Sequence, residues 1–202
     1  MLRRTVFIGL ALAAASPLAI LSLRSEASSP AIAVAAPAGP SWKVDYANSR
    51  LGFVGEQTGK AFQGKFRKFE ATIVFDPDNP ATARIDVTVD MTSAVTGDKQ
   101  RDSALPGSDW FKAKEFPVAR YVARSVEKKP DGSYVAEGDL TIRGVTRRVP
   151  LPFTLTLDGK KATAKGEASL IRSDFGVGQG EFADATWVGL GVKVTIDLRA
   201  TR

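Results

Sequence analysis

From residue 41 onwards, hydrophobic and polar residues alternate along the chain with a period of two. A β-strand places successive side chains on opposite faces, so this alternation predicts strands with one apolar and one polar face. In the last run, aliphatic residues alternate with lysine, threonine and aspartate. The clearest runs are residues 69–75, 85–89, 134–142, 149–157 and 188–198.

Weaker alternation adds further strands, and turn-forming residues separate neighbouring runs. The additional strands are expected at 42–47, 51–55, 65–69, 118–126 and 162–170. The turns are DPDNP (76–80), PDG (130–132), RG (143–144) and DG (158–159). About eight to ten strands in hairpin order, without long amphipathic helices between them, predict an all-β domain that is either a closed antiparallel barrel or a two-sheet sandwich.

The segment TGDKQRDSALPGSDWF, residues 96–111, interrupts the alternation. Thr96 or Asp98 can cap a short helix that ends before the proline, because both side chains accept hydrogen bonds from backbone N–H groups. Helical turns between barrel strands lie at an open end of the barrel. We therefore expect the adjacent aromatic residues Trp110 and Phe111 to pack over one end.

Two residue types are missing, and their absence restricts the chemistry. The chain has no cysteine and no histidine. It therefore has no disulfide, no thiolate nucleophile and no Ser-His-Asp triad, and it lacks histidine, the commonest metal ligand. No pair of carboxylates has the spacing of an acid–base dyad, and no serine lies in a G-x-S-x-G motif. The composition favours a binding protein over an enzyme, with no metal and no cofactor.

The charge of the chain is modest. Residues 41–202 contain 25 basic and 21 acidic side chains, a net charge of +4. The basic residues are scattered along the sequence, so we expect no nucleic-acid partner. A weak attraction to an anionic lipid or ligand remains compatible with this charge.

The N-terminal residues have the features of an export signal. Arg3 and Arg4 precede an uncharged apolar stretch at 5–23, and the segment 33–35 has the A-x-A form that a signal peptidase cleaves. We expect a signal peptide at 1–35, a linker at 36–41 and one domain at 42–202. A retained membrane anchor is the alternative, because nineteen uncharged residues could just span a bilayer.

The expected inner faces of the strands combine large aromatic residues with very small ones. Tyr121 lies between Ala119 and Ala123 on one face, and residues 162–168 place three alanines and a glycine on another. A filled barrel uses such alternation to fit its taper, and a ligand cavity uses it to leave space. The pattern leaves both interpretations open.

Five stretches together resemble the YceI-like, polyisoprenoid-binding proteins of bacteria. They are GKFRKFEATIVFDPDNP (64–80), TGDKQRD (96–102), DWFKAKEFPVARY (109–121), GDLTIRGVTRRVPLPF (138–153) and RSDFGVG (172–178). The resemblance covers nearly all of residues 42–200. It implies a lipocalin-like closed antiparallel β-barrel of about eight strands in the periplasm. It also implies a tunnel for a long isoprenoid chain, either a polyprenyl phosphate or a quinone tail.

The chain departs from the family at one visible point. Many members have a His-Ser pair at the start of the second strand, where this chain has Asn48 and Ser49. This departure excludes a histidine-dependent role at that position. The expectation of a barrel does not depend on it.

The implied ligand site has a tunnel and a polar portal. The candidate wall residues are Phe53, Phe62, Phe66, Phe75, Trp110, Phe111, Tyr121, Phe153 and Trp187. The candidate head-group residues are Lys99, Arg101, Asp102, Arg172 and Asp174. Each aromatic residue could instead belong to the core or to the outer packing, and Arg101 with Asp102 could form an ion pair that fixes the loop.

These observations lead to one functional hypothesis and one alternative. The hypothesis is an exported, non-enzymatic carrier or scavenger of an isoprenoid lipid or quinone. The alternative is a filled barrel that acts in envelope stress or redox processes through contacts with a partner protein. The expected partners are the lipid, transient contact with a membrane or membrane protein, and a second copy of the chain in a homodimer.

Overall fold

The computed structural model describes residues 39–202, so the expected signal peptide and half of the linker lie outside the described residues. The strands are β1 Ser41–Val44, β2 Arg50–Gln57, β3 Lys60–Phe66, β4 Phe69–Val74, β5 Arg84–Asp90, β6 Ala94–Val95, β7 Val118–Lys128, β8 Tyr134–Ile142, β9 Val145–Asp158, β10 Lys161–Ile171 and β11 Gly191–Thr201. The helices are α1 Lys99–Ala104 and the 3₁₀ turns η1 Pro80–Thr82, η2 Met91–Ser93, η3 Arg172–Phe175 and η4 Gly180–Phe182. Within this part of the chain, no helix is long and apolar enough to cross a bilayer.

The strands close into a barrel. The sheet order is β1-β4-β5-β7-β8-β9-β10-β11-β2-β3-β6, and β1 also pairs with β11. The additional pairing completes a ring of eight strands, β1, β4, β5, β7, β8, β9, β10 and β11, and every pairing is antiparallel. The predicted closed antiparallel barrel is confirmed, and the sandwich is excluded.

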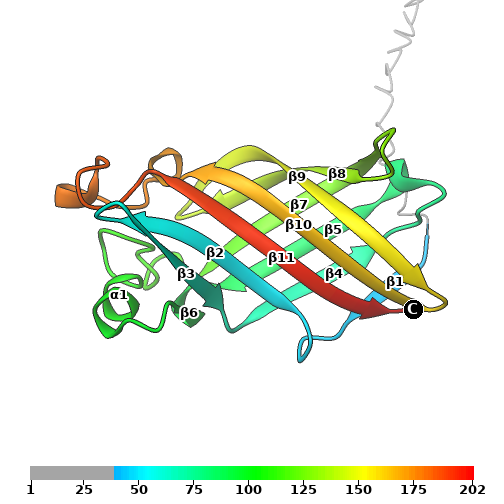
Figure 1. The fold of residues 1–202 in the computed structure, drawn as a ribbon, viewed down its shortest axis with the longest axis horizontal. Helices are drawn as coiled ribbons and strands as arrows, with labels where there is room; N and C mark the ends of the chain where they lie inside the picture. Colours follow the sequence, from blue (N-terminus) through cyan, green and yellow to red (C-terminus); the bar gives the residue numbers. More distant parts are fainter. Residues whose placement is uncertain (1–38) are drawn as a thin grey trace, which may run out of the picture. The chain divides into compact units, whose positions relative to one another are not determined.

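The remaining three strands extend the ring at one end (Figure 1). β11 pairs first with β1, at Val44↔Ala200, and then with β2, at Arg50↔Asp197, so β1 and β2 are two halves of one long interrupted strand. β3 with β4, and β5 with β6, are interrupted in the same way. The predicted continuous strand at 65–69 is therefore wrong, because the chain leaves the ladder between Phe66 and Phe69.

Ser49 stabilises the interruption between β1 and β2. Its side chain is buried, and its hydroxyl oxygen accepts a hydrogen bond from the backbone N–H of Arg199 at 2.9 Å. This amide belongs to the part of β11 that faces the gap between the two halves of the broken strand. A side chain thus replaces the missing ladder bond.

Replacing Ser49 by alanine is expected to lower the free energy of unfolding by about 1–3 kcal/mol, because the amide of Arg199 would lose its partner. Urea unfolding monitored by circular dichroism measures this change. Ser169→Ala, at an exposed position of β10, is the matched control and should change the free energy by less than about 0.5 kcal/mol. Equal effects of the two substitutions would show that the Ser49 hydroxyl does not stabilise the gap.

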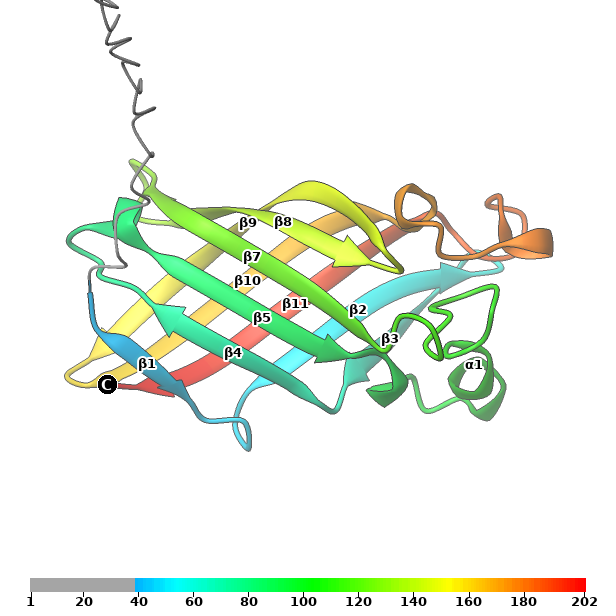
Figure 2. The same ribbon diagram turned by 180° about the vertical axis from the view of Figure 1, so that it is seen from behind.

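The two ends of the barrel are built differently. In Figures 1 and 2, α1 and the loops of residues 172–190 gather at one end, and the β7–β8 and β9–β10 turns lie at the other. Asp98 caps α1 by accepting a hydrogen bond from the N–H of Arg101 at 3.0 Å, as one of the two expected caps. The short helix therefore forms where the alternation stops.

Candidate functional site

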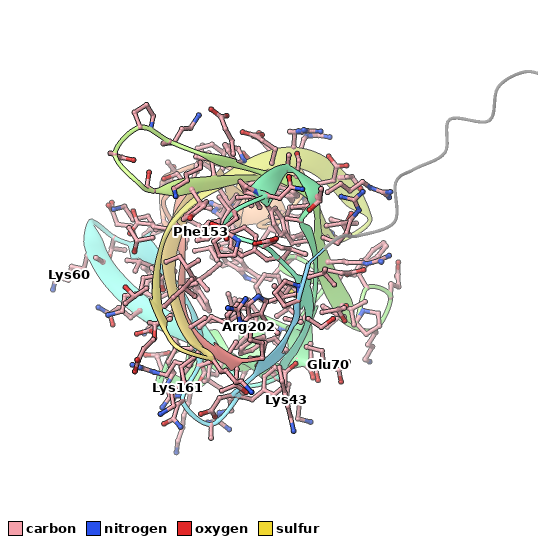
Figure 3. All side chains as sticks on the ribbon, turned by 90° about the vertical axis from the view of Figure 1, so that its right-hand side faces the viewer. Lys43, Lys60, Glu70, Phe153, Lys161 and Arg202 are labelled. Carbon is pink, nitrogen blue, oxygen red and sulfur yellow. The ribbon has the colours of Figure 1, made fainter. Side chains whose placement is uncertain are left out.

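The barrel encloses an elongated cavity of about 280 Å³. Its walls are the inner faces of the strands, and the lining is almost entirely aliphatic and aromatic. Figure 3, which looks into the barrel from one end, shows Phe153 pointing inward while Lys60, Lys161 and Glu70 point outward. The described residues that line the cavity include no carboxylate, and their ionisable members are Tyr121 and Arg172.

The structure places eight of the nine expected wall residues around this cavity, and their contact with a ligand stays a prediction. They are Phe53, Phe62, Phe66, Phe75, Trp110, Phe111, Tyr121 and Phe153. The placement of Trp187 in the wall is wrong, because its side chain is 52% exposed. The apolar residues of the run at 188–198 occupy even positions, so a period of two places Trp187 on the opposite face, and the residue lies in the loop before β11.

Glycines allow three of the large rings to lie flat against the wall. A Cβ atom at Gly64 would lie 2.2 Å from the Phe53 ring, one at Gly138 would lie 2.4 Å from the Tyr121 ring, and one at Gly55 would lie 2.8 Å from the Phe62 ring. Each ring thus occupies the space that a neighbouring side chain would fill. The alternation of large and small residues leaves the centre of the barrel open.

The Tyr121 hydroxyl is buried in this apolar wall. Its oxygen lies 2.9 Å from the carbonyl oxygen of Ala136 and 3.1 Å from that of Val149, so its proton is held by backbone acceptors. Burial raises the pKa of Tyr121, since the ionised form would lose its solvation. The hydroxyl is therefore neutral and already has partners in the wall.

Arg172 closes the end of the cavity near α1. The side chain is only 5% exposed, and its guanidinium carbon lies 5.5 Å from the centre of the Trp110 ring. Burial lowers the pKa of Arg172, although the group stays protonated. Its N–H groups donate at 2.7–3.0 Å to the backbone carbonyls of Val177, Asp184, Val188 and Gly189.

This geometry gives Arg172, one of the expected head-group residues of the portal, a structural role, and its contact with a head group stays a prediction. Four of the five N–H donors of Arg172 hold the loop of residues 177–189 against the barrel. A Cβ at Gly178 would lie 1.8 Å from the Arg172 Nη1, so the loop can approach the guanidinium only with glycine there. Arg172 is therefore a buried clasp, a side chain that holds the loop of residues 177–189 against the barrel. This role explains its position beside the cavity.

Arg101 fixes the α1 segment to the rim of the barrel. Its guanidinium carbon lies 4.6 Å from the centre of the Phe62 ring, and Nη1 donates to Gln57 Oε1 at 3.0 Å. The nearest carboxylate partner is Asp98 at 3.8 Å. The alternative of an Arg101–Asp102 ion pair is therefore wrong.

The other expected head-group residues lie outside the cavity lining. Asp102 accepts hydrogen bonds from the N–H and hydroxyl of Thr96 at 2.6 and 2.7 Å, and these bonds lower its pKa. Lys99 begins α1 with its side chain exposed, and Asp174 is exposed in η3. A head-group contact stays a prediction for all of them.

Two residues that line the cavity, Trp42 and Phe175, are not among the predicted wall residues. Trp42 is 6% exposed, lines the cavity and donates from Nε1 to the carbonyl of Phe75 at 2.9 Å. Phe175 lines the cavity at the Arg172 end. Trp42 could have been found from the alternation at 42–47, whereas Phe175 lies in a 3₁₀ turn that has no period-two signal.

A further polar contact holds the aromatic segment in place. Arg143 and Gly144 form the β8–β9 turn with positive φ values of 51° and 75°, so the expected turn at 143–144 is confirmed. The Arg143 guanidinium donates to the carbonyls of Ser108 and Trp110. The turn thereby positions the loop that carries Trp110 and Phe111 over the barrel end.

Hydrogen bonds lower the pKa of six aspartates in the described residues. They are Asp45, Asp86, Asp90, Asp102, Asp131 and Asp184. A carboxylate with a lowered folded-state pKa stabilises the fold above its unfolded pKa, and this stabilisation is lost as the pH falls through the folded pKa.

The free energy of unfolding is therefore expected to stay nearly constant between about pH 6 and 8 and to fall below about pH 4. Histidine and cysteine, which titrate near neutral pH, are both absent. Urea unfolding at a series of pH values measures the profile. A clear change in stability between pH 6 and 8 would contradict this expectation.

The fold and the site define a class, the closed antiparallel β-barrels with an apolar lumen, and the polar groups of Tyr121 and Arg172 beside the lumen already have partners. Residues 42–200 match the YceI-like domain. The chain belongs to this family.

Individual relatives agree with this assignment. The chain is similar to Protein YceI of Escherichia coli O157:H7, with 33% identity over 120 residues, 56% of this chain and 62% of that protein. It is 34% identical over 111 residues to UPF0312 protein plu2095 of Photorhabdus laumondii, 54% of this chain and 57% of that protein. Each match spans less than two thirds of the relative's length.

Solved structures share the fold. BcnA of Burkholderia cenocepacia superimposes with a TM-score of 0.76 at 34% identity, covering 79% of this chain and 100% of BcnA. A polyisoprenoid binding domain from Saccharophagus degradans, implicated in plant cell wall breakdown, gives a TM-score of 0.61 over 79% of this chain and 97% of that domain. Because its identity is 14%, the second likeness concerns the fold alone.

Proposed function

We propose that the protein is an exported carrier of an isoprenoid lipid, with the tail of the lipid in the barrel cavity. The observation that carries this proposal is the cavity of about 280 Å³ with an almost wholly apolar lining. A filled barrel that acts through protein contacts would need large side chains across every inner face. Glycines instead keep the Phe53, Phe62 and Tyr121 rings against the wall, which favours the carrier.

The energetics of the cavity favour recognition by the tail. Burial of each methylene gains about 0.8 kcal/mol, so several isoprene units would gain well over about 10 kcal/mol before association costs of about 4–15 kcal/mol. The Arg172 and Tyr121 polar groups are engaged with backbone carbonyls and have little left to offer a head group. The head of the lipid is therefore expected at an end of the barrel.

The choice of an isoprenoid tail rests on the family. The YceI-like stretches of the sequence imply a polyprenyl phosphate or a quinone tail, and a barrel of the same fold in Saccharophagus degradans is described as polyisoprenoid binding. The N-terminal segment with the features of a signal peptide supports a periplasmic location. Together they give the carrier its proposed cargo and compartment.

Catalysis has no support in the cavity. An acid–base reaction would need a carboxylate with a raised pKa inside the lumen. The described lining residues contain no carboxylate, and the aspartates with resolved shifts have lowered pKa values. We therefore propose binding without chemistry.

Titration with prenyl phosphates of increasing length tests the proposal. Trp42 and Trp110 line the cavity, so their fluorescence reports occupation. The affinity is expected to rise at least about tenfold with each added isoprene unit until the cavity is filled, because each unit buries further apolar surface. Saturated alkyl phosphates of matched length are the control for isoprenoid specificity. An affinity that does not depend on tail length would overturn the proposal.

A further inference from the structure

The fold gathers basic side chains that are scattered in the sequence onto one wall of the barrel. We call this face the basic wall. It comprises the outer faces of β1, β2, β3, β10 and β11 and the residue that follows β3, Arg67. Its exposed basic residues are Lys43, Arg50, Lys65, Arg67, Lys161, Lys165, Lys193 and Arg199. The acidic residues of the same outer faces are Glu56, Glu167 and Asp197, and two further carboxylates border the wall, Asp45 beside Arg199 and Asp102 beside Lys65 and Arg67.

With eight basic and five acidic side chains, the basic wall and its border have a net charge of +3, so most of the net charge of +4 on residues 41–202 lies on this side of the barrel. Sequence neighbours do not reveal this face, because its residues come from both termini of the domain. In the end-on view of Figure 3, Lys43 and Lys161 of this wall point outward from the barrel. The expectation of dispersed charge therefore needs correction for the folded domain.

Most of the positive charge on the basic wall is free to contact a partner. Lys193 pairs with Glu167 at 3.0 Å, and Lys165 lies 3.8 Å from Asp197. Lys43, Lys65 and Lys161 are exposed and take part in none of the ion pairs found in residues 39–202. On the β5–β7 side, by contrast, Arg120 is paired with Asp86.

Two large apolar side chains are exposed at one end of the basic wall. Trp187 is 52% exposed and Ile171 is 45% exposed. Ile171 ends β10 opposite Gly191, and the carbonyl of Trp187 accepts from the N–H of Thr58 in the β2–β3 turn. Ile171 thus lies at the end of a strand of the basic wall, and Trp187 lies in the loop that leads into the neighbouring strand β11.

We propose that the basic wall docks on the surface of an anionic bilayer, with Trp187 and Ile171 entering the head-group region. Basic residues attract anionic lipid, and exposed tryptophan prefers the membrane–water interface. A nucleic acid would be attracted by the charge but would not account for the exposed apolar pair at its end. The idea that docking serves lipid exchange rests on the proposed function. The docking itself does not depend on that function.

Vesicle co-sedimentation of the mature protein tests the inference. Vesicles of equal parts phosphatidylcholine and phosphatidylglycerol are compared with vesicles of phosphatidylcholine alone. The protein is expected to bind the anionic vesicles at least about tenfold more tightly, and salt should weaken this binding. The Trp187 emission should shift to the blue on binding, and Trp187→Phe should remove most of that shift.

Charge reversal locates the surface. The triple variant Lys43→Glu, Lys65→Glu, Lys161→Glu should bind anionic vesicles at least about tenfold more weakly. The control reverses three exposed basic residues of β7 and β9, Arg124→Glu, Lys128→Glu and Arg147→Glu, and should retain more of the binding. Equal losses in both variants, equal binding to neutral vesicles, or binding to DNA without binding to vesicles would overturn the inference.

The same variants separate this inference from the proposed function. In detergent solution, the wall variant should bind prenyl phosphates like the unaltered protein, because the three lysines lie outside the cavity lining. Prenyl binding without vesicle binding in the unaltered protein would defeat docking alone. Vesicle binding without prenyl binding would defeat the carrier and leave docking in place.

Discussion

Replacing Arg172 by methionine is expected to lower the free energy of unfolding by about 3–5 kcal/mol and to open one end of the barrel. Four backbone carbonyls would lose their donor, and the loop of residues 177–189 would lose the group that holds it. For a domain of this size, the midpoint of thermal unfolding should fall by roughly 10 °C. Differential scanning calorimetry measures this shift.

Two further variants test the cause of this loss. Arg172→Lys keeps the charge but supplies donors from a single nitrogen, so it should recover only a small part of the stability. Arg124→Met removes an exposed arginine and should have little effect on stability. If Arg172→Met is no more destabilising than Arg124→Met, the hydrogen bonds of Arg172 do not stabilise the fold.

Replacing Ala164 by tryptophan is expected to weaken isoprenoid binding about a thousandfold or more. Ala164 lies on the inner face of β10, paired with Leu155 and Leu198, and lines the cavity. An indole at this position would take the place of about five tail carbons, each worth about 0.8 kcal/mol. The affinity for a long prenyl phosphate, measured by extraction of bound lipid, gives the result.

Thr163→Trp is the matched control, because Thr163 is the preceding residue of the same strand and points to the outer face. It should leave binding unchanged. The stability of Ala164→Trp is also informative: an open cavity accommodates the ring, whereas a filled core would lose about 1–3 kcal/mol through overpacking. Equal lipid binding by the two variants would contradict a tail site in the lumen.

Most of the barrel could be predicted from the period of two. The expected run at 134–142 matches β8 residue for residue in its bounds, and the turn at 143–144 lies where expected. The interruptions were not predictable, because residues 45–49 and 67–68 are stabilised by distant partners such as Arg199 and Ser93. The alternation of residues within a segment does not indicate where the hydrogen bonds between two long strands are interrupted.

The candidate site, too, could be predicted only in part from the sequence. Side chains on regular strands, such as Phe53 and Phe153, were placed correctly because strand geometry fixes their direction. Trp187 lies in a loop and Arg172 begins η3, and in both places the direction of the side chain depends on tertiary hydrogen bonds. Whether the barrel is filled or has a cavity could not be predicted from the sequence, because it depends on rings that lie over glycines of neighbouring strands.

The most direct test of the central claim is native mass spectrometry of the protein purified from its native host cells, with identification of the released lipid after denaturation. We predict a stoichiometric adduct whose mass is that of an isoprenoid, and the head group will show whether it is a phosphate or a quinone. A protein that is recovered without ligand, and that stays without ligand when offered quinones and polyprenyl phosphates, would contradict the account.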